Sequence, residues 1–364
     1  MAFPDDRDRE LLRLSHKVLE TSEDLLDWMS QHKAARKSQD LGPISANDEF
    51  QLLNLRRKAS NLLRSSKVPV AAAVYGASQV GKSLFVGRIL RPADSRFCPL
   101  GRDENLGAPA YFPNLNFDHD LNPQCGSNEA TAIVTRFTTK DRFDETVPTK
   151  FPVLVRGLSR AEWLRMLARG FRSECEMPRD EMWQESQLET LFEELSSSYV
   201  GTDVDREWRM DLLDVYTYLR RLDPLRYRVD ETMFNGLLSR YSLTNDGYVQ
   251  LAARLCWNSW PSLTGLFNRV WSFLEMTRQH GRDGIACHWA AVRFLLDSQR
   301  TPQHENHLSQ VFPKVSVNDL VDRVEDGWYV LDYQPGQGPP KHDMATIQSA
   351  MLELVIPVLP DRLN

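Results

Sequence analysis

Residues 68–90 read VPVAAAVYGASQVGKSLFVGRIL, an apolar run followed by a glycine-bounded loop and an amphipathic segment. Residues 70–74 have the length and composition of a short buried strand, and the apolar residues after Ser83 recur at helical spacing. The stretch therefore predicts a strand, a loop and a helix in that order. Such a unit is typical of an α/β domain.

The loop at residues 76–83 fits the pattern G-x-x-x-x-G-K-[ST]. Its glycines let backbone N–H groups surround a phosphate, Lys82 reaches the terminal phosphates, and Ser83 offers a ligand to Mg²⁺. The N-terminus of the following helix favours the same anion. The alternative is a glycine turn between a core strand and a core helix, with Lys82 solvated. We expect nucleotide binding by Gly76, Ala77, Ser78, Gln79, Val80, Gly81, Lys82, Ser83 and Leu84.

The composition of the 364 residues, 41% hydrophobic and 26% charged, is typical of a globular protein with two or three domains. The net charge is −6, with acids and bases spread along the chain, so no basic field favours nucleic acid as a partner. The five cysteines are far apart and none has C-x-x-C spacing, which predicts a reducing compartment and no structural zinc.

Residues 1–10, MAFPDDRDRE, lack the basic-then-apolar plan of a signal peptide. No uncharged apolar run approaches the roughly 18 residues of a membrane-spanning helix. We therefore expect no transmembrane segment and a cytoplasmic location. The sequence offers no support for peripheral membrane contact.

The first 66 residues predict a helical hairpin. Residues 7–35 predict one amphipathic helix, because their apolar residues recur at intervals of three, four or seven positions. The residues Gly42 and Pro43 break the pattern, and a second helix opens near Ser45 and extends to residue 63. The hairpin either packs on the nucleotide domain, which we favour, or joins the helices of a partner. The apolar positions of the first helix are Leu11, Leu14, Val18, Leu25 and Met29.

Residues 91–128 are rich in Pro, Gly, Asn and Asp and predict a long loop. A β-branched run then predicts a strand near 132–138, so Thr131 lies where the loop enters that strand. In switch GTPases a threonine at such a place closes over Mg²⁺ and the terminal phosphate. On residues alone, Thr131 is equally an ordinary threonine at a strand start. The acidic and histidine cluster at 118–120 is better explained as a solvated loop than as a metal site.

A third strand is expected at 151–157, paired with 132–138 as a hairpin. Helical patterns then dominate to about residue 300, and we expect them near 159–170, 180–197, 205–221, 230–240, 246–256, 262–279 and 284–298. The most aromatic part has large apolar residues at helical spacing, which indicates core rather than a membrane or partner face. Its residues are Trp257, Trp260, Leu263, Phe267, Trp271 and Phe273.

The run 328–332, WYVLD, predicts a fourth strand that ends in an acid, followed by a glycine-proline loop and a last helix at 343–356. Asp332 is a candidate to hold Mg²⁺ through water, as in phosphate-loop enzymes, although an edge strand ending at a turn explains it better. The chain thus divides into a hairpin at 1–66, the first part of a nucleotide-binding domain at 67–158, a helical insert at 159–300 and a return to the α/β domain at 301–364.

Two stretches carry a resemblance to a known family. Residues 75–83, YGASQVGKS, and residues 122–138, NPQCGSNEATAIVTRFT, resemble a family of bacterial virulence factors often called SrfC-like, whose members look like large phosphate-loop proteins related to dynamin-type GTPases. The resemblance implies a bacterial protein, with secretion as an effector left open, and it implies that Thr131 is the switch threonine. It also implies catalytic roles for Lys82 and Thr131, and Mg²⁺ held by Ser83 and Thr131.

Three departures from the family pattern stand out. Gln79 lies one position later than the glutamine usual in dynamin-like phosphate loops. The run from Asp332 to Gly336 is one residue too long for Asp-x-x-Gly, and the run from Thr139 to Asp141 lacks the spacer of a base-reading motif. The strands visible in the sequence are also fewer than an open α/β sheet usually has. We therefore expect this chain to be an N-terminal portion of a longer protein and to need downstream sequence or a partner for full activity.

These observations together predict a phosphate-loop NTPase domain, GTPase-like, with a large all-helical insert and an N-terminal helical hairpin. The expected activity is Mg²⁺-dependent binding and hydrolysis of GTP, or second of ATP. The alternative is a non-hydrolysing, nucleotide-regulated module. In either case the helical regions would bind a protein partner.

Overall fold

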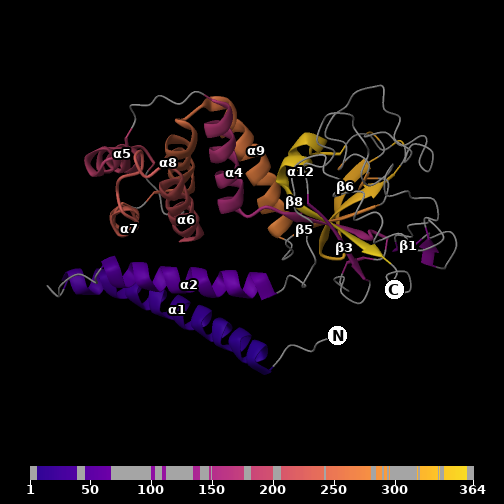
Figure 1. The fold of residues 1–364 in the computed structure, drawn as a ribbon, viewed down its shortest axis with the longest axis horizontal. Coiled ribbons are helices and arrows are strands. Elements are labelled where there is room, and N and C mark those ends of the chain that lie inside the picture. The colour runs from indigo at the N-terminus through magenta and orange to yellow at the C-terminus, as the bar shows by residue number, and fades with distance from the viewer. Residues whose placement is uncertain are drawn as a thin grey trace. The chain divides into compact units, whose positions relative to one another are not determined.

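The computed structural model describes residues 6–38, 46–66, 100–102, 109–111, 134–139, 147–148, 150–175, 182–199, 206–241, 243–279, 284–288, 291–292, 295, 318, 320–334, 336 and 340–358 (Figure 1). The chain divides into two compact units: unit 1 comprises Met1–Val70 and Arg160–Phe267, and unit 2 comprises Ala71–Ser159 and Asn268–Asn364. The described fold is mixed α/β, mostly helical, with one six-stranded mixed sheet.

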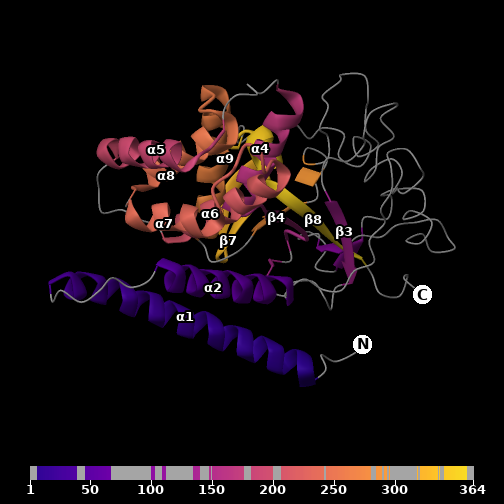
Figure 2. The ribbon, with the colours of Figure 1, turned by 60° about the vertical axis from the view of Figure 1, so that its left-hand side comes forward.

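Unit 1 begins with two long helices, α1 (Asp6–Ser38) and α2 (Ala46–Ser66), which lie side by side in both ribbon views (Figures 1 and 2). Both helices were expected from the apolar spacing. Buried Leu26 of α1 and Leu53 of α2 form a small core cluster with Met210. The hairpin therefore packs on a helix of the 206–222 region within the same unit.

The helical region confirms six predicted helices, with ends shifted by a few residues. Local capping fixes two of the starts, since Asp230 accepts a hydrogen bond from Met233 N at 2.8 Å and Thr244 accepts one from Gly247 N at 3.3 Å. The helices are α4 (Arg160–Glu174), α5 (Glu185–Ser198), α6 (Arg206–Leu222), α7 (Glu231–Arg240), α8 (Asn245–Trp257) and α9 (Pro261–Arg278).

The aromatic stretch from 257 to 273 is mostly core, as predicted. Trp257 and Phe267 are fully buried, and Trp271 and Phe273 are nearly so. Trp260 is the exception at 49% exposed, where its ring meets the edge of Phe171.

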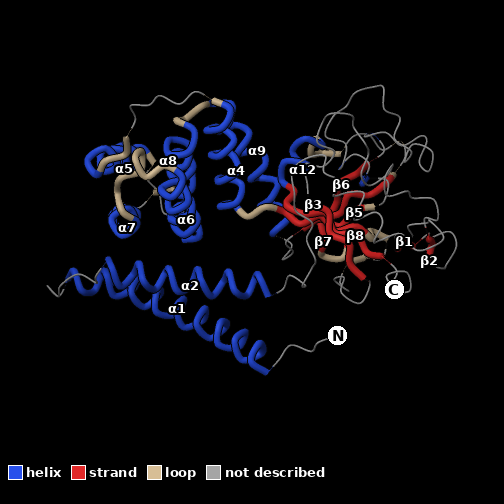
Figure 3. Tube along the Cα trace, viewed as in Figure 1, coloured by secondary structure: helices blue, strands red, loops and turns tan. Residues whose placement is uncertain are grey.

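The sheet belongs to unit 2, and its strands are drawn in red in Figure 3. The strand order is β3-β8-β4-β5-β7-β6. The pairs β3·β8 and β5·β7 are parallel, and the other neighbours are antiparallel. A short separate pair is formed by β1 (Leu100–Arg102) and β2 (Pro109–Tyr111). The strands of the main sheet are β3 (Val134–Thr139), β4 (Val153–Gly157), β5 (Gly284–Cys287), β6 (Leu320–Glu325), β7 (Trp328–Tyr333) and β8 (Met351–Val358).

The strands expected at 132–138, 151–157 and 328–332 are confirmed, but the expected hairpin is wrong. β3 and β4 do not pair with each other, because β8 lies between them, parallel to β3 and antiparallel to β4. The pairing of β8 joins it to strands that lie about 200 residues or more away in the sequence. Such a long-range pairing leaves no periodic signal in the sequence.

Two helix predictions near the C-terminal side are wrong in part, although residues 344–350 and the described residues 291, 292 and 295 are helical. The expected helix at 343–356 ends early, since α12 (Met344–Ala350) gives way directly to strand β8. The expected helix start at 284 is strand β5, whose four residues are all buried. A Cβ on Gly284 would lie 2.4 Å from the carbonyl oxygen of Val155, so only glycine permits this close approach of β5 to β4.

Candidate functional site

The predicted phosphate-loop residues, 76–84, and Thr131 lie outside the described residues. The structure does describe the strand that follows the threonine, because β3 begins at Val134. Glu353 of β8 forms ion pairs with Arg136 of β3 at 2.9 Å and with Arg156 of β4 at 3.7 Å. These contacts tie β3 to the centre of the described sheet, so the strand after Thr131 has a fixed place.

Asp332, the candidate Mg²⁺ acid, lies near the end of β7 and is fully buried. One carboxylate oxygen accepts a hydrogen bond from Tyr333 N at 2.8 Å. The other lies 2.8 Å from Arg323 and 3.3 Å from Lys150 Nζ, and it accepts a hydrogen bond from Gln334 Nε2. Two cations therefore compensate this buried charge, which fits a structural role for the acid.

The sequence favours an edge strand for this segment, but the structure contradicts that prediction. β7 lies inside the sheet between β5 and β6. The burial of Trp328, Val330 and Leu331 follows from that interior position. Among the described residues, no three His, Cys, Asp or Glu side chains form a group that could hold a metal ion.

A second polar cluster in unit 2 was not anticipated from the sequence. Asp322 of β6 is 3% exposed and accepts hydrogen bonds from Tyr329 Oη and from Lys341 N, the latter at 2.6 Å. His342 Nδ1 lies 2.7 Å from the same carboxylate. Asp322 and Tyr329 are diagonal neighbours across the β6·β7 pair, which brings them together. The partners belong to no sequence motif.

Burial has the largest effect on the pKa of Asp322 and raises it, but hydrogen bonds from Tyr329, His342 and Lys341 together outweigh burial and lower the pKa. Burial and the carboxylate together raise the pKa of the Tyr329 phenol, which therefore stays a hydrogen-bond donor. The cluster fastens the segment before α12 to the β6·β7 pair.

We expect Asp322→Asn to speed amide hydrogen exchange in residues 320–333 by about 10- to 150-fold at pH 7, since hydrogen bonds to a charged group contribute about 1.5–3 kcal/mol. A lowered folded pKa means that this stability is present above the unfolded pKa of about 3.9 and is lost as the pH falls through the folded value. The difference between parent and variant should then shrink. Exchange measured by mass spectrometry at pH 7 and at a pH below the folded pKa of Asp322 checks this.

The matched control is Asp326→Asn, the same chemical change at an exposed residue of the β6–β7 turn. Asp326 has a φ of 50°, a conformation that asparagine also adopts readily. Equal exchange in the two variants would show that the Asp322 cluster contributes nothing particular to the sheet.

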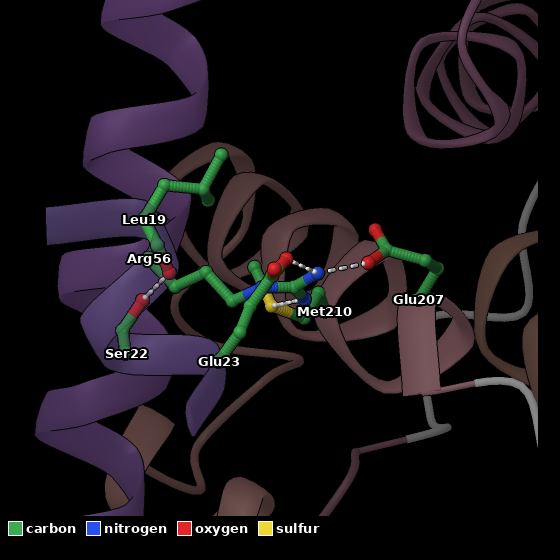
Figure 4. Close-up of polar contacts among 6 residues, drawn as sticks. All are labelled: Leu19, Ser22, Glu23, Arg56, Glu207 and Met210. Atoms are coloured by element: carbon green, nitrogen blue, oxygen red, sulfur yellow. Dashed lines mark hydrogen bonds and ion pairs between the residues drawn. The ribbon is translucent and has the colours of Figure 1, made fainter. Parts of the chain in front are cut away.

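In unit 1, charged contacts attach the hairpin to α6. Figure 4 shows Arg56 of α2 between Glu23 of α1, at 2.8 Å, and Glu207 of α6, at 2.7 Å, with its Nη1 3.4 Å from the sulfur of Met210. Two further pairs, Arg57 with Asp214 and Arg209 with Glu49, each measure 3.1 Å. Ion pairs of three half-buried arginines thus join the three helices.

A protein-family model described as "Putative bacterial virulence factor" matches residues 25–274, more than half of the chain. The chain belongs to this virulence-factor family. The match begins within α1 and ends within α9, so it covers α2, most of the helical region, the phosphate-loop pattern and Thr131. Comparisons with curated proteins and with solved structures gave no match.

No described helix of this virulence-factor family member is long and apolar enough to cross a membrane. Three cysteines fall in the described part of the chain, and all three, Cys175, Cys256 and Cys287, are free thiols. Burial raises the pKa of Cys256 to about 12, so its thiol is protonated and unreactive at neutral pH.

Proposed function

We propose that this virulence-factor family member binds GTP, and second ATP, together with Mg²⁺ through residues 76–84. The single observation that carries the proposal is the complete G-x-x-x-x-G-K-[ST] pattern, placed between a strand-like run and a helix-like run. Further support comes from the described fold, because unit 2 contains a mixed sheet with helices, the setting in which such loops operate.

In the proposed site the backbone amides of the loop hold the phosphates, and Lys82 neutralises the terminal ones. Ser83 and Thr131 would hold the metal ion, which supplies charge stabilisation when bound. Thr131 is our candidate for sensing the terminal phosphate, since it precedes β3, and an ion pair of β3 fixes that strand in the sheet. The proposed reaction is attack of water on that phosphate, and catalysis rests on positioning and charge. We also propose that this chain is related to dynamin-type GTPases.

A second candidate is a nucleotide-regulated module that does not hydrolyse its ligand. The observation that favours it is the absence of two sequence motifs, Asp-x-x-Gly and the base-reading motif, from residues 1–364. The large helical region, which makes up most of unit 1, would then recruit a protein partner. Free thiols at all three described cysteines support a reducing, cytoplasmic setting for either candidate.

Turnover measured beside binding separates the two candidates. Saturable GTP or ATP hydrolysis at about 1 s⁻¹ or faster, the low end of ordinary enzyme rates, would establish an enzyme. Binding without turnover, both by this chain alone and in the presence of its downstream sequence or partner, would establish the regulated module. If neither nucleotide binds in the presence of Mg²⁺, both candidates fail.

A further inference from the structure

Helix α1 carries two stripes of mainly apolar residues, and the second stripe is offset from the first by one residue along the sequence. The first faces the rest of unit 1 and is buried or half-buried, and it consists of Leu12, Ser15, Leu19, Ser22, Leu26 and Met29. Its two serines donate hydrogen bonds to carbonyl oxygens of their own helix, so they leave no unpaired hydroxyl. Leu26 of this first stripe packs with Leu53 of α2 and Met210 of α6, and α1 lies along α2.

The second stripe points to solvent. Its five large apolar side chains are between 40% and 50% exposed, and Thr21 completes the three-and-four spacing. We call this set the exposed stripe: Leu11, Leu14, Val18, Thr21, Leu25 and Trp28. A surface helix ordinarily has one apolar face, so a second stripe with the spacing of a coiled-coil seam indicates a second helical neighbour.

The direction of that neighbour follows from helix geometry. One residue corresponds to about 100° around an α-helix of 3.6 residues per turn. A helix packed on the exposed stripe and the helix α2 would therefore contact α1 from two directions that are about 100° apart around the axis of α1. This is the arrangement of a helix at the corner of a four-helix bundle, which packs on two neighbours at once.

Charges next to the exposed stripe indicate what the neighbour is. One flank of the stripe is occupied by the buried stripe, so only the other flank is free to meet a partner. The free flank carries Glu10, Lys17, Asp24 and Gln31, each seven residues from the next. In a parallel pair this flank would face serines that are already packed within their own chain. In an antiparallel pair, free flank meets free flank.

A second copy of α1 fits the antiparallel arrangement. The layers place Leu14 against Leu25 of the second copy, Leu11 against Trp28, and Val18 against Thr21, and each layer occurs twice by symmetry. In the same register Lys17 meets Asp24 of the second copy, also twice. Glu10 meets the neutral Gln31, so no like charges are opposed.

We propose that the exposed stripe is the interface of a homodimer in which two α1 helices pair antiparallel about a two-fold axis. This proposal is independent of nucleotide binding, because it uses only residues of α1. The hairpin of α1 and α2 from each copy would then form a four-helix arrangement (Figure 2 shows one hairpin).

Sedimentation velocity across a wide range of protein concentration tests the interface. The parent chain should self-associate, and Leu14→Glu/Leu25→Glu should raise the dissociation constant at least about 100-fold, since two leucine layers are lost. Both positions are 45% exposed, so the fold should survive, which circular dichroism checks. The matched control is Leu222→Glu in α6, equally apolar and 50% exposed. A parent chain that stays monomeric throughout, or a dimer unaffected by the double variant, would overturn the proposal.

A charge swap tests the partner and the direction. Lys17→Glu and Asp24→Lys should each weaken self-association, by about tenfold at low salt. Mixing the two variants should restore dimers, because the introduced glutamate of one copy would face the introduced lysine of the other, and the unchanged Asp24 would face the unchanged Lys17. The double variant Lys17→Glu/Asp24→Lys should also dimerise. If neither the mixture nor the double variant recovers, the antiparallel pairing of two copies is wrong.

Discussion

The Lys82→Ala variant is expected to lose measurable nucleotide binding while its fold stays intact. In the phosphate loop the lysine contacts the β- and γ-phosphates. Each hydrogen bond to a charged group contributes about 1.5–3 kcal/mol, so two such contacts correspond to a loss of affinity of more than about a hundredfold. Fluorescent GTP and ATP analogues, titrated in the presence of Mg²⁺, measure the loss directly.

The control for this variant is Lys58→Ala, which removes the same side chain from an exposed position on α2. It should leave the affinity unchanged. Circular dichroism and the thermal midpoint of Lys82→Ala should match those of the parent chain. A variant that still binds nucleotide tightly would show that Lys82 is only a solvated side chain beside a glycine turn.

The Thr131→Ala variant is expected to lower hydrolysis by about 100-fold and affinity by much less. The physical reason is that a switch threonine acts on the terminal phosphate and its metal ion, an interaction that strengthens as charge develops in the transition state. Steady-state turnover beside equilibrium binding separates the two effects. If turnover is unchanged in the variant, Thr131 is an ordinary threonine at a strand start.

Thr135→Ala provides the matched control, because Thr135 lies on β3 and its buried Oγ1 has no hydrogen-bond partner among the described residues. This change should have little effect on turnover. Limited proteolysis gives a second test. Residues 91–131 should be protected by a non-hydrolysable triphosphate more than by a diphosphate, and equal cleavage in both states contradicts the switch role.

The sequence predicted well those elements whose signal is local. The helices of the region 160–278 follow from apolar residues at three-and-four spacing, and caps such as Asp230 and Thr244 mark their starts. Strands β4 and β7 are short apolar runs bounded by turn residues, and both were found. Their position in the sheet was not, because strand order depends on pairing between distant segments.

Three strands of the six-stranded sheet were missed, each for a particular reason, and the short β1·β2 pair lies within the segment expected as a loop. β6 places Asp322 on its buried face, so its sequence, LVDRVE, lacks the apolar alternation of a half-buried strand. β8 begins directly after α12 with a nearly continuous apolar run, which periodicity alone cannot separate from a buried helix. β5 has only four residues, too few for any pattern.

The candidate site shows the same division. The pattern at 76–83 predicts a phosphate loop from local sequence alone, and this stays a prediction, because these residues lie outside the described ones. The partners of Asp332 could not be predicted. Lys150 lies far away in the sequence, and Arg323 reaches the carboxylate only because β6 and β7 pair.

The central claim is that the loop at 76–84 binds nucleotide, and thermal unfolding of the purified chain, titrated with GTP or ATP in the presence of Mg²⁺, tests it most directly. A ligand that binds only the folded state stabilises it by about 2.7 kcal/mol at a hundred times its dissociation constant. We predict an unfolding temperature that rises steadily with GTP concentration, rises less with ATP, and does not change with either nucleotide in Lys82→Ala. The account would be contradicted if neither nucleotide changed the unfolding temperature, even at about 1 mM. A ligand with a dissociation constant of about 1 mM has a binding free energy of only about 4 kcal/mol, so this concentration would reveal even weak binding.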